Sequence, residues 1–273
     1  MRLKSLACFR NGFLNILKTN NKWLQNVTVL CTGTRRDAII QNIMEKNAFL
    51  CRLLDLFYPP RCVWCHCFLV EGEKRDGVCK SCRASLPVFN REERQKNLPG
   101  LDSCTSLLEY KGNVRRSILR YKFNGLSFYS SVYTDLMITR LDREEYVCDY
   151  VTWVPLSRKR LRSRGYDQAK LLSEEFATRA GLPCDELLKK VRNTAPQSGT
   201  GSRAERKSNI KDAYCTVQEE KIIGKTILLV DDIVTTGATL SECAQALKRA
   251  GANQVRALTL ARTDLKSLEL EKP

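Results

Sequence analysis

Residues 226–240 read Thr-Ile-Leu-Leu-Val-Asp-Asp-Ile-Val-Thr-Thr-Gly-Ala-Thr-Leu, and this stretch decides the fold. The continuous apolar run from Ile227 to Val230 is typical of a central parallel strand that is buried on both faces. Two carboxylates, Asp231 and Asp232, follow directly. Because ligands of open α/β sheets collect at the carboxyl ends of strands, the stretch predicts a ligand-binding edge at this point.

The loop after this strand has the composition of a phosphate site. It consists of Thr235, Thr236, Gly237, Ala238 and Thr239. Small hydroxyl residues and a glycine let backbone N–H and side-chain O–H groups close around a phosphate, and the N-terminus of a following helix adds partial positive charge. The adjacent carboxylates indicate a ligand that also presents vicinal hydroxyls, such as a ribose 5-phosphate, or a divalent cation. The alternative is a strand that ends in Asp and a Thr-Gly turn, with no ligand.

The rest of the chain from residue 103 alternates strand and helix. We expect strands over 103–110, 150–154, 226–231 and 255–261, and helices over 114–123, 129–141, 168–180 and 238–250. This alternation predicts an α/β domain with a parallel sheet flanked by helices. We expect the domain to span 103–265, preceded by a polar linker over 91–102 and followed by a tail over 266–273.

Two basic, polar segments lie where such a sheet would bind anions. The first follows the strand 150–154 and contains Pro155, Leu156, Ser157, Arg158 and Lys159. This segment predicts a binding site for a departing pyrophosphate. The alternatives are a solvated basic turn and a nucleic-acid-binding patch. The second, over 193–212, contains Gln197, Arg203, Arg206 and Asn209. Its length and composition suit a lid that shields a reactive sugar from water, and a disordered linker is the alternative.

Four of the 13 cysteines form two Cys-x-x-Cys pairs, Cys62/Cys65 and Cys79/Cys82. This spacing predicts a tetrahedral, structural Zn²⁺ site in a small module over 48–90. The alternative is a set of buried, reduced cysteines. His66 is the only histidine in the chain, and we expect it beside the metal, since four thiolates already complete the site.

The N-terminal 47 residues show no sustained periodicity, and we place them outside the folded core. A flexible basic arm, a misassigned start that belongs at Met44 and a mitochondrial targeting peptide remain as alternatives. A short amphipathic helix is expected over 49–57.

Charge and composition narrow the class of protein. The net charge of +16 indicates polyanionic partners, either phosphorylated small molecules or nucleic acid. No apolar run is long enough to cross a membrane. Paired cysteines without a secretory signal favour a cytoplasmic location.

Residues 230–239 resemble the signature of type I phosphoribosyltransferases, which bind 5-phosphoribosyl-1-diphosphate (PRPP) together with Mg²⁺. The resemblance implies catalytic roles for Asp231 and Asp232 at the ribose 2- and 3-hydroxyls. It also implies that residues 235–239 hold the 5-phosphate.

Further motifs are similar to the ComF family of competence-associated, phosphoribosyltransferase-like proteins. They are residues 154–169, Tyr121-Lys122-Phe123-Asn124-Gly125, and Gln197, Arg203, Arg206 and Asn209. This resemblance runs from about Leu53 to Ala261. It implies a type I phosphoribosyltransferase-like sheet with an N-terminal cysteine ribbon, and a role in DNA uptake.

Two functions follow as expectations. One is a PRPP-dependent transferase, although no stretch identifies its acceptor. The other is a non-catalytic factor that binds single-stranded DNA and works with competence proteins such as a helicase. The sequence indicates no oligomeric state.

Overall fold

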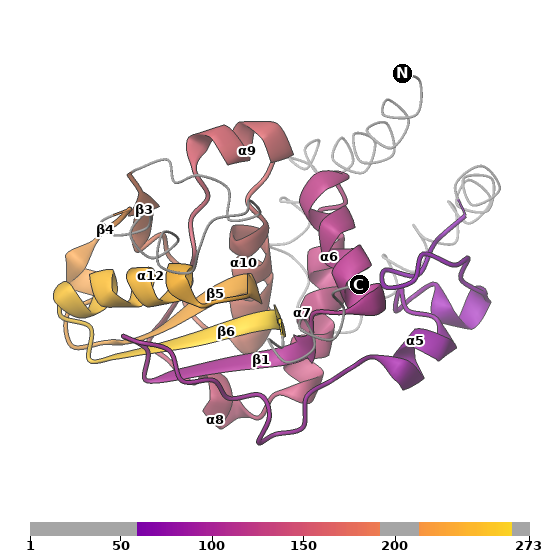
Figure 1. The fold of residues 1–273 in the computed structure, drawn as a ribbon, viewed down its shortest axis with the longest axis horizontal. Helices are drawn as coiled ribbons and strands as arrows, with labels where there is room; N and C mark the ends of the chain where they lie inside the picture. Colours follow the sequence, from indigo (N-terminus) through magenta and orange to yellow (C-terminus); the bar gives the residue numbers. More distant parts are fainter. Residues whose placement is uncertain (1–58, 192–212, 264–273) are drawn as a thin grey trace, which may run out of the picture. The chain divides into compact units, whose positions relative to one another are not determined.

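The computed structural model describes residues 59–191 and 213–263 (Figure 1). The N-terminal extension, the helix predicted over 49–57 and the tail over 266–273 lie outside the described residues. So do Gln197, Arg203, Arg206 and Asn209. The described residues from Arg61 onward belong to one compact unit.

A four-stranded parallel sheet forms the centre of this unit. Its strands are β1 (Ser103–Glu109), β2 (Tyr150–Trp153), β5 (Thr226–Val234) and β6 (Gln254–Arg262), in the order β1-β6-β5-β2. All three pairings are parallel, which confirms the predicted sheet. β5 continues three residues beyond the predicted end at 231, so Asp231 and Asp232 lie within its last residues.

Helices cover both faces of the sheet. On one face, α6 (Gly112–Phe123), α7 (Tyr129–Arg140) and α10 (Gln168–Ala180) share a core with Leu228 and Val230. On the other, α12 (Ala238–Arg249) packs over Ile227 and Leu229 (Figure 1). All four residues of this apolar run are fully buried, as the sequence predicts for a central strand.

The sequence also predicts how α10 is placed. Its buried residues include Ala169, Leu172, Phe176 and Ala177, the stripe expected from helical spacing. Gly181 ends the helix in the left-handed region with φ of 68°, as a C-cap glycine does.

Several short elements are absent from the prediction. They are the helices α5 (Lys80–Ser85), α8 (Arg143–Tyr146) and α9 (Arg158–Arg164), two 3-10 turns over Glu71–Glu73 and Glu219–Lys221, and an antiparallel pair, β3 (Leu188–Lys190) with β4 (Tyr214–Thr216). Elements of three to seven residues carry too little periodicity to stand out in a sequence. Within the described ranges, no helix combines the length and apolar character needed to cross a membrane.

Residues 87–98 run beside β1 and join the domain. Val88 and Gln95 form bridges to Leu108 and Thr105 of β1. Arg94 pairs with Glu145 at 3.1 Å, and their side chains are only 11% and 7% exposed. This stretch, most of which the sequence presents as a linker, therefore makes specific contacts with the sheet.

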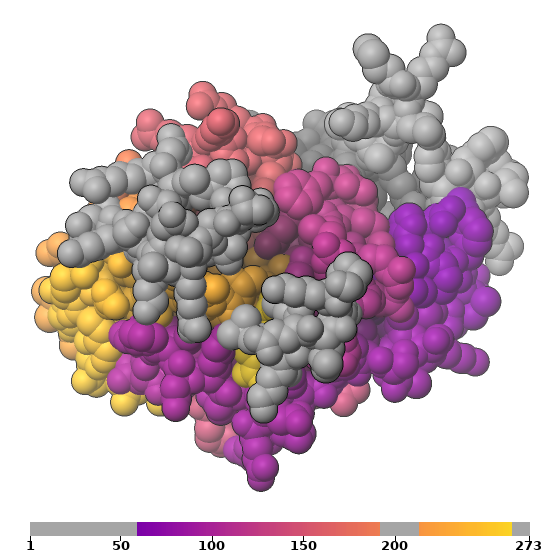
Figure 2. All heavy atoms as spheres, in the orientation of Figure 1, coloured from indigo at the N-terminus to yellow at the C-terminus, as the bar shows by residue number. Residues whose placement is uncertain are grey.

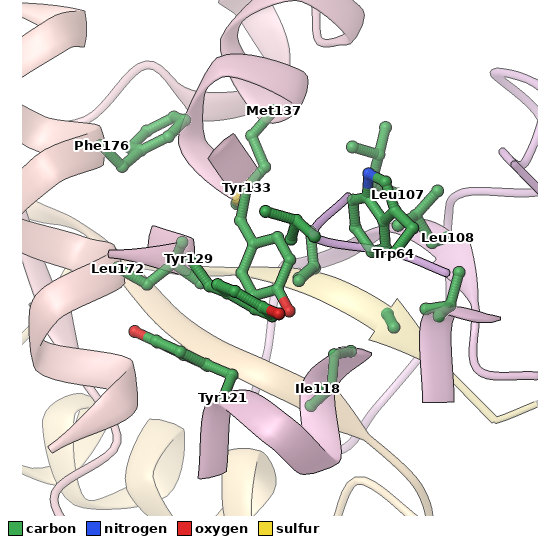
Figure 3. Packing of buried hydrophobic residues seen from close by; sticks show 14 of the residues in the cluster. Trp64, Leu107, Leu108, Ile118, Tyr121, Tyr129, Tyr133, Met137, Leu172 and Phe176 are labelled. Carbon is green, nitrogen blue, oxygen red and sulfur yellow. The ribbon is translucent and has the colours of Figure 1, made fainter. Parts of the chain in front are cut away.

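The cysteine module, residues 61–85, packs directly on α6 and α7. Cys62, Val63 and Trp64 are buried in the same cluster as residues of both helices. The rings of Trp64 and Tyr133 lie 5.1 Å apart between centroids (Figure 3). Arg120 of α6 donates from Nη2 to the carbonyls of Val63 and Trp64, at 2.9 and 2.6 Å. The module is therefore part of the domain's core.

Candidate functional site

The two carboxylates at the end of β5 have different surroundings. Asp232 is buried, and its Oδ1 lies 2.8 Å from Nζ of Lys122 on α6. Asp231 accepts a hydrogen bond from the backbone N–H of Asp232 at 2.8 Å. Burial and the neighbouring charge of Asp232 raise the pKa of Asp231 well above its usual range, and Lys122 opposes this rise. Lys122 thus compensates the charge of Asp232, and Asp231 offers carboxylate oxygens that could accept hydrogen bonds from hydroxyls or hold a cation.

The phosphate loop, residues 235–239, joins β5 to the N-terminus of α12. Gly237 precedes the helix with φ of 82°, and a Cβ there would lie 2.4 Å from Cδ2 of Leu98. Only glycine fits both constraints without a shift. Lys96 donates from Nζ to the carbonyl of Thr235 at 3.1 Å. The segment before β1 therefore braces the loop that the sequence predicts to hold a phosphate.

The segment after β2 is only partly a loop. Pro155, Leu156 and Ser157 are irregular, and α9 begins at Arg158. Ser157 accepts a hydrogen bond from the N–H of Arg160 at 3.4 Å, and Gly165 ends the helix with φ of 82°. The available sequence signals for α9 were therefore its two caps. Its run of like charges argued against a helix.

These elements border one cleft of about 1230 Å³ at the carboxyl edge of the sheet. Asp231, Asp232 and all five residues of the phosphate loop line it. So do Pro155 and Leu156, whereas Arg158 and Lys159 are exposed on α9 and are not among its lining residues. The structure thus brings together most of the predicted site among the described residues.

The charge of the described cleft lining is strongly positive. Against its two carboxylates stand seven cations: Lys111, Arg115, Arg116, Lys122, Arg160, Arg164 and Lys190. Within the described part of the chain, neither Arg160 nor Lys190 has a carboxylate partner in an ion pair. Such a surface is suited to a ligand with several negative charges.

Lys190 and Tyr214 are cleft residues that sequence reasoning missed. They come from β3 and β4, where Nζ of Lys190 donates to the Tyr214 hydroxyl at 3.0 Å and lies 4.9 Å from its ring centroid. Burial lowers the pKa of Lys190, and the positive charge of Arg160 lowers it further. A bound anion would relieve this repulsion. No sequence signal could place Lys190 here, because the β3–β4 pairing that does so is only three residues long.

The cysteine module has the donor set of a structural zinc site. The ligand atoms of Cys62, Cys65, Cys79 and Cys82 all lie within 4.8 Å of one another, and Cys65 and Cys79 sulfurs are 3.6 Å apart. Tetrahedral zinc with Zn–S bonds of ~2.3 Å requires sulfurs about 3.8 Å apart, so the cluster fits the ion. Backbone N–H groups of Cys79 and Cys82 donate to Cys62 and Cys79 sulfurs at 3.4 Å, as expected around thiolates.

His66 lies beside this cluster and not in it, as the sequence predicts. Its backbone takes a φ of 70°, and its N–H donates to the carbonyl of Cys62 at 2.9 Å. Its role among the described residues is to shape the first knuckle.

Two family models match the chain. Residues 162–272 match the phosphoribosyl transferase domain and residues 53–94 match the double zinc ribbon domain. Competence protein ComFC of Streptococcus pneumoniae is 32% identical over 161 residues, which cover 59% of this chain and 68% of that protein. Competence protein F of Haemophilus influenzae is 25% identical over 228 residues, which cover 76% of this chain and 98% of the relative.

One further relative and one solved structure are also similar to this chain. DNA utilization protein YhgH of Escherichia coli is 37% identical over 116 residues, which span 42% of this chain and half of that protein. A crystal structure of adenine phosphoribosyltransferase shares 17% identity over 66% of this chain and 91% of its own, with a TM-score of 0.34.

The parallel sheet, the acidic pair with its phosphate loop and the matched domain together define a protein of the phosphoribosyltransferase fold with a cysteine ribbon. Within that class, the chain belongs to the ComF family.

Proposed function

We propose that this chain binds PRPP, or a related ribose phosphate, with Mg²⁺ in the cleft and acts in competence and DNA uptake. The observation that carries the proposal is the position of Asp231 and Asp232 beside the phosphate loop in an otherwise cationic cleft. A phosphate alone would be repelled by the carboxylates. A ligand with vicinal hydroxyls and several phosphates suits both parts of the surface.

The proposed contacts follow from the separation of the cleft into an acidic pair and a cationic surface. Asp231 and Asp232 accept hydrogen bonds from the ribose hydroxyls, and residues 235–239 hold the 5-phosphate at the N-terminus of α12. Arg160 and Lys190, which lack carboxylate partners among the described residues, take the pyrophosphate together with Pro155 and Leu156, which line the cleft at the end of β2.

Mg²⁺ suits the oxygen donors of this site, since carboxylates and phosphates are the ligands that it prefers. Asp231 is the better candidate ligand, because Lys122 already occupies one oxygen of Asp232. When bound, the ion would neutralise charge on the pyrophosphate.

The proposed reaction is displacement of pyrophosphate at the anomeric carbon by a nitrogen nucleophile. The cations of the cleft stabilise the negative charge that develops on the leaving group. Asp231 and Asp232 are the only carboxylates in the described cleft lining, which contains no histidine and no cysteine.

Calorimetric titration with PRPP tests the binding proposal. We expect saturable binding by the unaltered chain that strengthens with Mg²⁺, and its loss in the double variant Asp231→Asn/Asp232→Asn. Asp135→Asn is the matched control, because Asp135 is an exposed carboxylate of α7 that pairs with Arg179, away from the cleft lining. Binding that survives in the double variant would show that the acidic pair does not hold the ribose. Pyrophosphate release with candidate acceptors then tests the transfer step.

A second function, binding of single-stranded DNA, is favoured by the basic wall of α6. Lys111, Arg115 and Arg116 are exposed and extend the cationic lining away from the acidic pair. Cytoplasmic single-stranded DNA and a helicase of the uptake machinery are the partners proposed for this role. If this surface tracks a strand, Arg115→Ala/Arg116→Ala lowers the salt dependence of binding by ~1.4 in log–log slope. Binding with an unchanged slope would exclude these two side chains.

A further inference from the structure

Helix α6 is a wall that the cleft and the cysteine module share. Residues three and four apart lie on one face of a helix, and α6 presents a different stripe to each neighbour. The stripe that lines the cleft consists of Gly112, Arg115, Arg116, Leu119, Lys122 and Phe123. The stripe that contacts the module consists of Asn113, Ser117 and Arg120. In Figure 2 the surface of α6, in magenta, lies between that of the module, in purple, and that of α9, in salmon.

The module stripe holds α6 against the first Cys-x-x-Cys knuckle. Ser117 is fully buried, and its hydroxyl donates to the carbonyl of Val63 at 2.6 Å. Because Ser117 has only one hydroxyl proton, the hydroxyl of Tyr133 donates to Ser117 in turn, at 2.7 Å. Arg120 donates to the same carbonyl of Val63 at 2.9 Å, which occupies both of its lone pairs. The cleft wall is therefore attached to the backbone inside this knuckle.

Asn113 connects the cleft to the second knuckle. Nη2 of Arg116, a cleft residue, donates to Oδ1 of Asn113 at 2.6 Å. An arginine can only donate, so the amide oxygen of Asn113 faces Arg116 and the amide nitrogen faces the module. There Nδ2 of Asn113 donates to Sγ of Cys82 at 3.9 Å. One amide thus joins a cation of the cleft to a sulfur of the four-cysteine cluster.

A bound metal ion would strengthen this connection. Four thiolates around Zn²⁺ leave a net negative charge on the cluster. Hydrogen bonds to an ionised acceptor are shorter and stronger than bonds between neutral groups, so the amide of Asn113 is held most firmly when the ion is bound. The bound ion therefore favours the orientation of Asn113 in which Oδ1 fixes Arg116 at the cleft wall.

We infer that the zinc centre of the module strengthens the binding of a polyanion in the cleft, with Asn113 as the positioning residue that links Cys82 to Arg116. The inference rests on the proposed ribose-phosphate site and concerns its regulation. A side chain that is already held in its binding position loses less conformational entropy when the ligand arrives. Because a coupling free energy between two sites is reciprocal, a ligand in the cleft also acts on the metal site.

Calorimetric titration of the zinc-loaded full chain with Mg²⁺–PRPP tests the coupling from the side of the cleft. Asn113→Leu keeps the size of the side chain and removes both amide contacts. We expect this variant to retain zinc, because four thiolates remain, and to bind Mg²⁺–PRPP at least about fivefold more weakly, the lower end of typical couplings. Asn253→Leu is the matched control. Asn253 is exposed and directly precedes β6, at the amino edge of the sheet and away from the cleft, so this variant should keep its affinity.

Absorption of the cobalt-substituted full chain tests the coupling from the side of the metal. Co²⁺ replaces zinc in four-thiolate sites, and its thiolate charge-transfer bands respond to hydrogen bonds at the sulfurs. We expect Mg²⁺–PRPP to shift these bands in the unaltered chain and in Asn253→Leu, and to leave them unchanged in Asn113→Leu. A merely structural role of Asn113 would not remove the shift, because the bands report only on the folded, metal-bound chain. Asp231→Asn/Asp232→Asn is the blank for direct removal of the metal by PRPP.

The outcomes separate this coupling from the proposed function. If Mg²⁺–PRPP binds the unaltered chain without shifting the cobalt bands, the coupling is overturned and the ribose-phosphate site stands. A shift of the same size in Asn113→Leu, or an unchanged affinity of this variant for Mg²⁺–PRPP, would also overturn it, because the coupling would then not pass through this amide. If Mg²⁺–PRPP does not bind the zinc-loaded chain at all, the proposed function fails and the coupling fails with it.

Discussion

Lys122 and Asp232 form a buried ion pair that joins α6 to the end of β5. Their Nζ and Oδ1 atoms are 2.8 Å apart, and the side chains are 18% and 7% exposed. The pair connects the residues that carry two separate resemblances, Tyr121–Gly125 and the phosphoribosyltransferase signature. The pair also holds Lys122 where its positive charge reduces the repulsion between the neighbouring carboxylates of Asp231 and Asp232.

Replacing Lys122 with methionine tests how much this ion pair contributes to the free energy of unfolding. Methionine keeps most of the length and removes the charge, which leaves the buried Asp232 and the half-buried Asp231 without this lysine. We expect the free energy of unfolding to fall by ~3–5 kcal/mol, the usual cost of breaking a buried pair. Urea denaturation measures it. Lys111→Met is the control, since Lys111 pairs with Glu109 on a more exposed surface, where a loss of ~0–1 kcal/mol is typical. If both variants lost the same amount of unfolding free energy, the Lys122–Asp232 pair would contribute no more to stability than an exposed ion pair does.

Asp231 predicts a pH dependence with a definite sign. Burial and Asp232 raise its pKa in the folded chain above the unfolded value, so the folded state binds the proton more tightly. The contribution of this group to stability is therefore most favourable at low pH and is lost as pH rises through the folded pKa. Each pH unit between the two pKa values corresponds to ~1.4 kcal/mol.

We expect Asp231→Asn to stabilise the chain at neutral pH while it abolishes ligand binding. Thermal or urea unfolding of both proteins between about pH 4 and 8 measures the difference, which should grow with pH. Asp135→Asn should show no such growth. A destabilised Asp231→Asn variant at neutral pH would mean that the carboxylate is satisfied in the fold and not held for a ligand.

The cysteine module predicts that zinc supports the whole domain. Because Cys62, Cys79 and Cys82 share a core with α6 and α7, loss of the ion should weaken both parts together. We expect Cys82→Ser to lose zinc and to lower the melting temperature in a single transition, and Trp64→Ala to cost ~3–5 kcal/mol. Cys67→Ser is the control, since this exposed thiol lies outside the four-sulfur cluster and should leave one zinc bound. Two separate unfolding transitions would contradict a shared core.

Gly237 and Gly165 allow backbone strain to be separated from a steric clash. Both have φ of 82°, but a Cβ on Gly237 would lie 2.4 Å from Leu98, whereas Gly165 has open space around it. We expect Gly165→Ala to cost ~1–2 kcal/mol and Gly237→Ala to cost more. Leu98→Ala should recover part of the excess in a double-mutant cycle measured by urea unfolding. Additive effects of Gly237→Ala and Leu98→Ala would show that the loop relaxes away from Leu98.

The sequence predicts the strands and helices that carry a long apolar pattern. Ile227–Val230 and the stripe of α10 have such patterns, and both are buried as expected. The acidic pair and the phosphate loop were also predictable, because they are contiguous in the chain and their chemistry depends on that order.

The rest of the site depends on contacts between distant segments. Lys122 reaches Asp232 from a helix more than a hundred residues earlier, and Lys190 reaches the cleft through a three-residue strand. Phe123 looks from its pattern like the end of an amphipathic helix, and only the fold shows that its ring is open to the cleft. The sequence did not predict α9, because the two caps, Ser157 and Gly165, favour a helix while the repulsion among its arginines and lysine disfavours one.

Thermal stability with and without Mg²⁺–PRPP tests the central claim most directly. A ligand that binds only the folded state raises the unfolding free energy by ~2.7 kcal/mol at a hundred times its dissociation constant. We predict a rise in melting temperature with Mg²⁺–PRPP that exceeds the rise with ribose 5-phosphate or with pyrophosphate alone, since PRPP engages both the acidic and the cationic parts of the cleft. No shift with Mg²⁺–PRPP at millimolar concentration, or the same shift in the Asp231→Asn/Asp232→Asn variant, would contradict the account.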